Sequence, residues 1–155
     1  MDAFAQKLQS FMAENGIAGE LLWFDSSCHS VAEAAETARA DVLDFVKNIC
    51  MVLPDGRLVV AIVKGEDRAS TTNVANVLGL GERPRPATPD EILEKTGYPC
   101  GGTPSFGYDA VFLVDERVLE RKTIYTGGGS TQALVKMSVS DLLLANGGRV
   151  AKIRK

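Results

Sequence analysis

The order of apolar and polar residues predicts short helices and short strands that are mixed along the chain without strict alternation. Apolar residues recur at helical spacing over residues 2–14. Cap and turn residues predict further helices at 30–38, 71–78, 89–97 and 140–145, with a helical turn at 117–120. Apolar runs predict strands at 20–24, 42–53, 58–63, 110–114, 123–125, 132–139 and 150–153. This mixture favours the α+β class, with a curled, largely antiparallel sheet and flanking helices in a single domain that spans residues 1–155.

Hydroxyl residues mark the starts of three predicted helices. Ser30 and Glu33 match a capping box, Thr88 precedes a proline at the first helical position, and Ser140 precedes the last helix. A serine or threonine at such a position accepts a hydrogen bond from a backbone N–H group of the first turn. These three side chains therefore set the expected helix starts.

The predicted strand at 42–53 holds a single lysine inside an apolar run. Side chains alternate between the two faces of a strand, so Lys47 shares a face with Phe45 and Ile49 and leaves Asn48 on the other. Both faces are mostly apolar, which predicts that the strand is covered on both sides. An ammonium group there is costly unless it lines a cavity or has a partner, so Lys47 is a candidate site residue. The alternatives are a lysine that reaches solvent from a strand end and one half of an ion pair.

Composition places the chain among ordinary globular domains. Its 155 residues are 45% hydrophobic and 24% charged, which suits one domain with a sizeable core. No apolar stretch approaches the roughly 18 residues that a membrane span needs. The segment from Met1 to Lys7 is not a basic region followed by an apolar core, so we expect no secretion signal. The expected location is the cytoplasm, without a membrane partner.

The three cysteines predict neither disulfide bonds nor a metal centre. Cys28, Cys50 and Cys100 are odd in number and include no CxxC pair, and His29 is the single histidine. A structural zinc site would need nearly all of these residues together, so we expect no metal and no cofactor. Cys28 and His29 are a poor nucleophile–base pair, because adjacent side chains usually point apart. His29 is expected instead in a loop near the mouth of a pocket.

The net charge of −3 is unevenly distributed along the chain. Residues 1–44 hold eight of the 20 acidic residues but two of the 17 basic ones, so the excess positive charge lies in the remainder. A basic face can meet a phosphate backbone, although most such side chains are only solvated surface. Lys64 and Arg68 are candidates for such a contact.

Two glycine-rich segments stand out in the second half of the chain. They read Gly97-Tyr98-Pro99-Cys100-Gly101-Gly102-Thr103-Pro104-Ser105-Phe106-Gly107 and Thr126-Gly127-Gly128-Gly129-Ser130. Paired glycines let backbone N–H groups approach a ligand, and prolines stiffen the loop around them. Such loops can direct amides at a carbonyl or phosphate oxygen, and the two segments can form walls of one pocket. Neither has the spacing of a Walker loop or a dinucleotide fingerprint, and irregular connections are the alternative reading.

These motifs, in this order, resemble the YbaK/EbsC family of aminoacyl-tRNA editing domains, which includes the editing domain inserted in bacterial prolyl-tRNA synthetases. The resemblance extends over residues 28–153 and rests on the helix start at Ser30, the Val46-Lys47-Asn48 step, both glycine segments, Tyr125 and the helix at Ser140. It implies a barrel-like mixed sheet and hydrolysis of amino acids wrongly esterified to tRNA. The family loop often reads GxxxP, whereas here Ser105 stands at the fifth position and Pro104 one place earlier.

The resemblance also implies roles for individual residues. Lys47 matches the family's key lysine, and Gly101 and Gly102 match the loop whose backbone faces the ester. The other candidates for substrate contact are Ser30, His29, Asn48, Pro104, Gly128, Gly129 and Ser130. Lys64 and Arg68 are candidates for the acceptor stem. The implied partners are the acceptor end of a mischarged tRNA, of the prolyl type, and an aminoacyl-tRNA synthetase, but not DNA.

Two other functions stay open at the level of sequence. A module of the same fold could bind tRNA or a synthetase without turnover, which Ser105 and Leu134 support because they depart from the family pattern. A small-molecule hydrolase could use the same pocket. An aminoacyl ester is already activated and needs no strong nucleophile, which fits a chain with one histidine and no evident triad. Cysteine, alanine, proline, serine and threonine all stay open as the amino acid removed.

Overall fold

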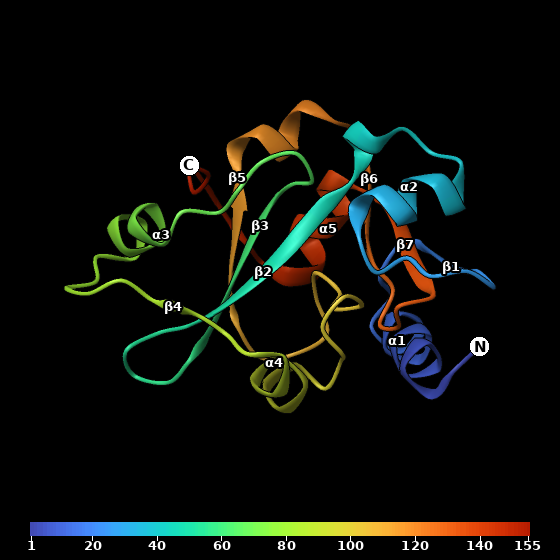
Figure 1. The fold of residues 1–155 in the computed structure, drawn as a ribbon, viewed down its shortest axis with the longest axis horizontal. Coiled ribbons are helices and arrows are strands. Elements are labelled where there is room, and N and C mark those ends of the chain that lie inside the picture. The colour runs from blue at the N-terminus through green and yellow to red at the C-terminus, as the bar shows by residue number, and fades with distance from the viewer.

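The computed structural model describes all of residues 1–155, which form two β-sheets flanked by helices (Figure 1). The first sheet is antiparallel and has the strand order β1 (Glu20–Trp23), β7 (Ala133–Ser138), β6 (Thr123–Gly127). The second has the order β4 (Arg85–Pro86), β2 (Val46–Val52), β3 (Leu58–Lys64), β5 (Val111–Asp115), β8 (Arg149–Ala151). In this sheet β4, β2 and β3 pair antiparallel, whereas β3, β5 and β8 pair parallel. The predicted α+β class is confirmed, although the strands form two sheets rather than one closed barrel.

Five α-helices and two short 3₁₀ helices flank these sheets. They are α1 (Ala3–Glu14), α2 (Val31–Ala38), η1 (Val42–Asp44), α3 (Thr71–Leu78), α4 (Pro89–Thr96), η2 (Glu116–Glu120) and α5 (Val139–Asn146). Ser30 and Thr88 cap α2 and α4 as predicted. The prediction that Ser140 caps the last helix is wrong, because β7 ends at Ser138 and the Ser138 hydroxyl accepts a hydrogen bond from the Asp141 N–H. None of these helices is both long and apolar enough to cross a membrane.

The hairpin of β2 and β3 forms the centre of the larger sheet. The turn sequence Pro54-Asp55-Gly56-Arg57 favours an antiparallel connection, and the two strands pair along their whole length. Val46 on one face of β2 belongs to the main core, which both sheets share, whereas Met51 on the other face packs in a second core beneath α3. The strand is therefore covered on both faces, as its apolar run predicts. The first three residues of the predicted strand form η1 instead.

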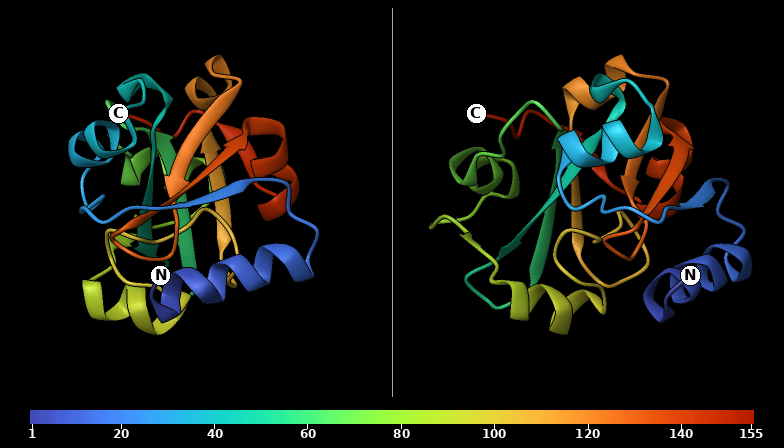
Figure 2. Two further views of the ribbon diagram at one scale, coloured as in Figure 1. Left: turned by 90° about the vertical axis from the view of Figure 1, so that its right-hand side faces the viewer. Right: turned by 45° about the vertical axis from the view of Figure 1, so that its right-hand side comes forward.

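The loop that follows α4 lies between two helices at one end of the molecule. Figures 1 and 2 show α4 and α1 at this end, with the loop of residues 97–110 between them and α2 at the opposite end of β6 and β7. Phe11 of α1 stacks on Phe106 of the loop with a centroid distance of 6.4 Å. The Lys7 ammonium lies 4.6 Å from the Tyr98 ring centroid. Helix α1 therefore holds the first glycine segment against the sheets.

Candidate active site

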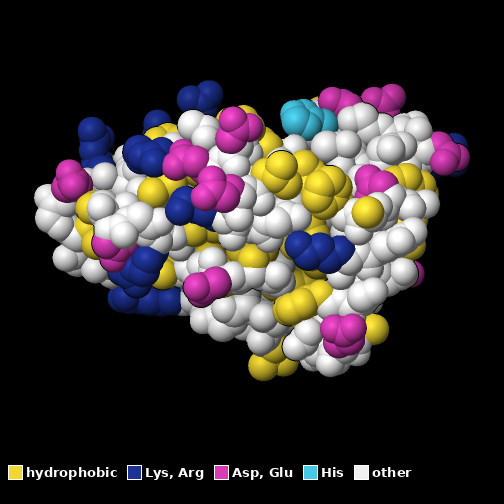
Figure 3. All heavy atoms as spheres, turned by 90° about the horizontal axis from the view of Figure 1, so that it is seen from below, with side chains coloured by type: hydrophobic (Ala, Val, Ile, Leu, Met, Phe, Trp, Pro, Cys, Tyr) yellow, Lys and Arg dark blue, Asp and Glu magenta, His cyan; other side chains and the backbone are white.

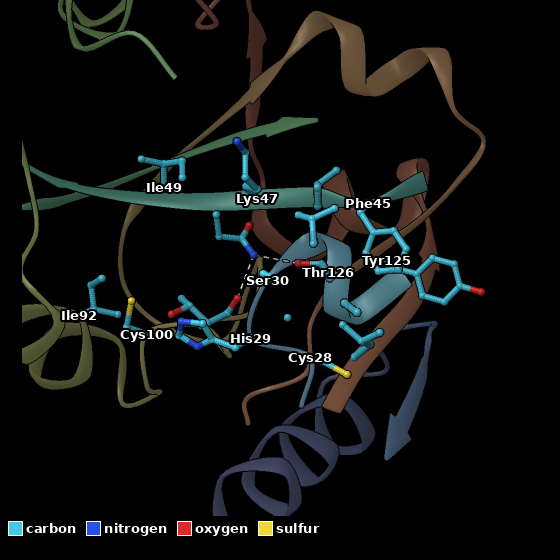
Figure 4. A pocket seen from close by; sticks show the side chains of 18 residues that line it. Cys28, His29, Ser30, Phe45, Lys47, Ile49, Ile92, Cys100, Tyr125 and Thr126 are labelled. Carbon is cyan, nitrogen blue, oxygen red and sulfur yellow. Dashed lines mark hydrogen bonds between the residues drawn. The ribbon is translucent and has the colours of Figure 1, made fainter. Parts of the chain in front are cut away.

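A cavity of about 260 Å³ opens between β2, β6, α2 and the loop after α4 (Figure 4). One part of its lining, the polar end, consists of His29, Ser30, Lys47, Asn48, Cys100, Gly101, Thr103, Thr126 and Gly127. The other part, the apolar end, consists of Cys28, Val31, Ala34, Phe45, Tyr125 and Leu134, which pack together. The remaining lining residues are Val46, Ile49 and Ile92, and the two isoleucines lie nearer the polar end in Figure 4. Segments that are far apart in sequence thus meet around one concave site, which is the usual form of a small-ligand site.

The apolar end carries no charged side chain. Phe45 and Tyr125 stack there with ring centroids 4.9 Å apart, and Cys28, Ala34 and Leu134 are buried around them. Burial, together with the nearby Glu33 carboxylate, raises the pKa of the Cys28 thiol, so Cys28 stays protonated at neutral pH. The apolar end therefore suits an uncharged group of modest size.

Lys47 lines the cavity at the edge of β2 and is half-buried. Its ammonium makes no ion pair and no hydrogen bond within the chain. In Figure 4, Lys47 is drawn on one side of β2, whereas His29, Ser30 and Cys100 lie on the other. The sequence predicted that the Lys47 ammonium would either line a cavity or have an acidic partner. In the structure Lys47 lines the cavity and has no acidic partner. A free cation at this edge is available to an anionic group that reaches across β2.

The edge of β2 also offers backbone groups to the cavity. Leu53 N–H donates to the Arg57 carbonyl, and Gly65 N–H donates to the Phe45 carbonyl, so the odd-numbered residues of β2 form the ladder with β3. The even-numbered residues, including Asn48, direct their N–H and C=O groups to the other edge. That edge is where the cavity lies, so the main chain at Asn48 can meet a ligand.

The side chain of Asn48 joins three segments behind the cavity. Its Nδ2 donates to the Thr103 carbonyl and to Thr126 Oγ1, each at 2.9 Å. Its Oδ1 accepts from Ser105 Oγ at 2.6 Å, and Ser105 Oγ lies 2.6 Å from Thr126 Oγ1. Ser105, which departs from the family loop, is fully buried in this network. The Asn48 amide is thus fully used inside the protein, and it positions the loop at Thr103 rather than facing a ligand.

Replacing Asn48 by alanine is expected to lower the free energy of unfolding by about 1–3 kcal/mol, because buried polar groups of Thr103, Ser105 and Thr126 lose a partner. Urea denaturation followed by circular dichroism measures this change. The matched control is Asn76→Ala at an exposed position of α3, where alanine is the better helix former. Equal effects of the two substitutions would contradict the structural role of the Asn48 amide.

Gly101 has a free N–H group at the wall of the cavity. No hydrogen bond uses this N–H, and the residue has a φ of +88°, which favours glycine. A Cβ at this position would lie 2.2 Å from His29 Nδ1, so the histidine ring rests directly on the Gly101 backbone. One amide donor and one imidazole therefore meet at the polar end.

Gly102 does not provide the second amide that the sequence suggests. Its N–H donates to the Pro99 carbonyl at 3.0 Å, and its own carbonyl accepts from Gly129 N–H at 2.7 Å. A Cβ on Gly102 would lie 2.6 Å from the backbone carbon of Ser130. The two glycine segments are thus packed back to back, and the absence of a side chain at Gly102 serves this packing rather than the cavity.

The second glycine segment meets the cavity at its first two residues, Thr126 and Gly127. Gly128 N–H donates to the Ala133 carbonyl, and Ser130 Oγ donates to Asp2 Oδ2 at 2.6 Å, so this part of the segment joins β7 and α1. The expected wall residues Gly128, Gly129 and Ser130, like Pro104, are buried outside the lining. Thr103, Thr126 and Gly127 line the cavity instead; they belong to the two quoted segments, but the sequence analysis did not single them out as site residues.

Lys64 and Arg68 differ in their surroundings. The Lys64 side chain is 6% exposed, and its Nζ lies 3.5 Å from Glu66 Oε2 and 3.6 Å from Glu120 Oε1. This placement argues against the predicted contact of Lys64 with an acceptor stem, because the ammonium already has two carboxylate partners. Arg68 is exposed and forms no ion pair, so it remains a candidate for that contact.

The face that contains α4 and α1 shows how charge is arranged near the site (Figure 3). The cyan group on this face is His29, since the chain holds a single histidine, and it is exposed at the edge of the view. Most of the lysine and arginine side chains visible on this face lie in the left half of the view. His29 therefore reaches solvent at the opening of the cavity, away from most of the basic side chains in this view.

Comparisons with known proteins identify relatives of the chain. The family model described as the aminoacyl-tRNA editing domain matches residues 25–144. The uncharacterized protein YwhH of Bacillus subtilis is 27% identical over 121 residues, which are 77% of this chain and 76% of YwhH. A proline–tRNA ligase of Solidesulfovibrio magneticus is 28% identical over 105 residues, which are 68% of this chain but 18% of the ligase. A crystal structure described as a candidate trans-editing enzyme for prolyl-tRNA synthetase has a TM-score of 0.91 and 26% identity, over 100% of this chain and 99% of that one.

Proposed function

Because the chain belongs to the family of aminoacyl-tRNA editing domains, we propose that it is a trans-acting deacylase that hydrolyses the ester of a mischarged tRNA. The observation that carries this proposal is the cavity. All of its lining residues, from Cys28 to Leu134, fall within the segment that the family model matches. It joins an uncharged end to a polar end with a free backbone amide, which is the combination that an aminoacyl ester needs.

The prolyl tRNA is the proposed carrier of the wrong amino acid. Two relatives point to it: a proline–tRNA ligase and a structure described as a candidate trans-editing enzyme for prolyl-tRNA synthetase. The proposed partners are accordingly the acceptor end of this tRNA and, at least transiently, the synthetase that charges it. The proposal takes the tRNA rather than DNA as the nucleic-acid partner.

The geometry supports one orientation of the substrate. The uncharged side chain of the amino acid fits the apolar end, and the ester carbonyl then lies at Gly101. The terminal ribose and phosphate extend over the edge of β2 toward Lys47. Lys47 in this orientation contacts a phosphate rather than the ester oxygen, because its ammonium projects from the other side of the strand.

Hydrolysis in this orientation needs a donor for the oxyanion and an attacking water. The free Gly101 N–H is the proposed donor, and Gly102 is not, since its N–H is already used. In enzymes generally, the loss of one such donor costs roughly 2.7–4 kcal/mol of transition-state stabilisation. Because an aminoacyl ester is already activated, its hydrolysis does not require a strong protein nucleophile. This fits a site that contains no catalytic triad.

A deacylation screen over a panel of mischarged tRNAs tests the proposed function. We expect the protein to hydrolyse at least one mischarged prolyl tRNA well above the uncatalysed rate, with KM rising as salt concentration rises. The control is the same tRNA charged with proline. Tight tRNA binding without hydrolysis of any member would instead indicate a binding module. Cleavage of small aminoacyl esters as fast as of tRNA, without salt dependence, would indicate a small-molecule hydrolase.

A further inference from the structure

The single histidine of the chain lies against Gly101, at the place where the ester would react in the proposed orientation. His29 lies in the turn before α2, where its own N–H donates to Ser27 Oγ at 3.2 Å and the next residue, Ser30, caps the helix. Its ring rests on Gly101, since a Cβ on that glycine would lie 2.2 Å from Nδ1 and 2.6 Å from Cε1. The imidazole and the free Gly101 amide therefore flank the same point of the cavity.

No other side chain of the cavity can easily accept a proton near neutral pH. Besides His29, the titratable residues of the lining are Cys28, Lys47, Cys100 and Tyr125, and no aspartate or glutamate lines it. Glu33 of α2 is the acidic group that faces Cys28. Histidine is the residue type whose charge ordinarily changes between pH 5 and 8. The neutral imidazole is thus the base that the site offers.

We infer that His29 is a catalytic base of the deacylase; this inference rests on the proposed function. A water molecule between the ring and the ester carbon transfers a proton to His29 as its oxygen bonds to that carbon. The Gly101 N–H stabilises the oxyanion. When the tetrahedral intermediate collapses, the ester C–O bond breaks, and the imidazolium returns the proton to the leaving ribose oxygen. The products are the free amino acid and the uncharged tRNA, so one water is consumed and no cofactor is needed.

Three variants of His29 separate proton transfer from packing. His29→Phe keeps a ring on Gly101 but has no proton acceptor, His29→Gln keeps a polar side chain of similar length, and His29→Ala opens space for added imidazole. Single-turnover deacylation is measured from pH 5.5 to 8.5 on the mischarged tRNA that the wild-type protein cleaves best, after subtraction of the rate without protein. Thermal melting of each variant verifies that it is folded.

General base catalysis predicts that kcat of His29→Phe and His29→Gln falls about 100-fold, with little change in KM. In the wild-type protein kcat should fall toward acid pH, because protonated imidazole cannot accept a proton, and the variants should lose this dependence. Imidazole should restore part of the activity of His29→Ala.

The outcomes distinguish this inference from the proposed function. If the wild-type protein is active and folded His29→Phe retains kcat within about threefold with the same pH profile, His29 only packs on the loop and the inference is wrong. If the wild-type protein hydrolyses no member of the panel, the deacylase function fails, and the inference that depends on it fails as well.

Discussion

Replacing Lys47 by alanine is expected to lower kcat/KM for a mischarged tRNA about 10- to 100-fold. A hydrogen bond to a charged group contributes about 1.5–3 kcal/mol, and each 1.4 kcal/mol is a factor of ten. The free energy of unfolding should change little, because the ammonium is half-buried and has no partner within the chain. Single-turnover deacylation at constant salt measures the first effect, and urea denaturation measures the second.

Two further variants decide whether Lys47 acts through its position or only through its charge. Lys47→Arg keeps the cation and should retain more activity than alanine. Lys152→Ala removes an exposed cation beyond β8 and should leave kcat/KM nearly unchanged. If Lys47 contacts a phosphate, the slope of log kcat/KM against log salt should also decrease by about one for Lys47→Ala. Near-normal turnover of Lys47→Ala at low salt would remove the lysine from the proposed substrate contacts.

Local sequence signals predicted most of the fold because they act over a few residues. The Thr88 cap with Pro89 behind it and the Ser30 cap of α2 are both complete within one helical turn. The start of α5 was predicted two residues late, since Ser138 and Ser140 are equivalent as sequence and only the pairing of β7 with β6 selects Ser138. The division of the strands into two sheets also depends on long-range pairing.

The candidate site was predictable in its location but less so in its individual contacts. Two adjacent glycines indicate that another group packs closely against the backbone there. They do not indicate whether that group belongs to a ligand or to another segment of the protein. In the structure Gly102 meets Ser130 and not a ligand, while Gly101 meets His29. The two lysines of the hairpin show the same limit. Lys64 is the buried one, and its ammonium lies near Glu66, two residues away, and near Glu120, which comes close only in the folded chain. The charge of a lysine does not by itself indicate which carboxylate it will pair with in the folded protein.

Replacing Gly127 by alanine is expected to have the largest effect on stability. A Cβ at Gly127 would lie 2.1 Å from the Thr103 carbonyl oxygen and 2.9 Å from that of Gly102, and both atoms belong to backbone that cannot rotate away. The loop must therefore shift, which we expect to lower the free energy of unfolding by about 2–4 kcal/mol. Because Gly101 is carried by the same loop, deacylation should fall at least about tenfold even at temperatures where the variant is folded.

Gly81→Ala is the matched control for Gly127→Ala, because neither glycine has a positive φ and a Cβ on Gly81 would meet no atom within 4 Å. Both substitutions remove the same conformational freedom from the unfolded chain, which by itself stabilises a protein by about 0.4–1 kcal/mol. The difference between the two variants in urea denaturation thus isolates the collision with the loop. Similar stability and similar deacylation in both variants would show that the two glycine segments are not packed against each other as described, and the Gly101 amide would then lose its fixed place at the cavity wall.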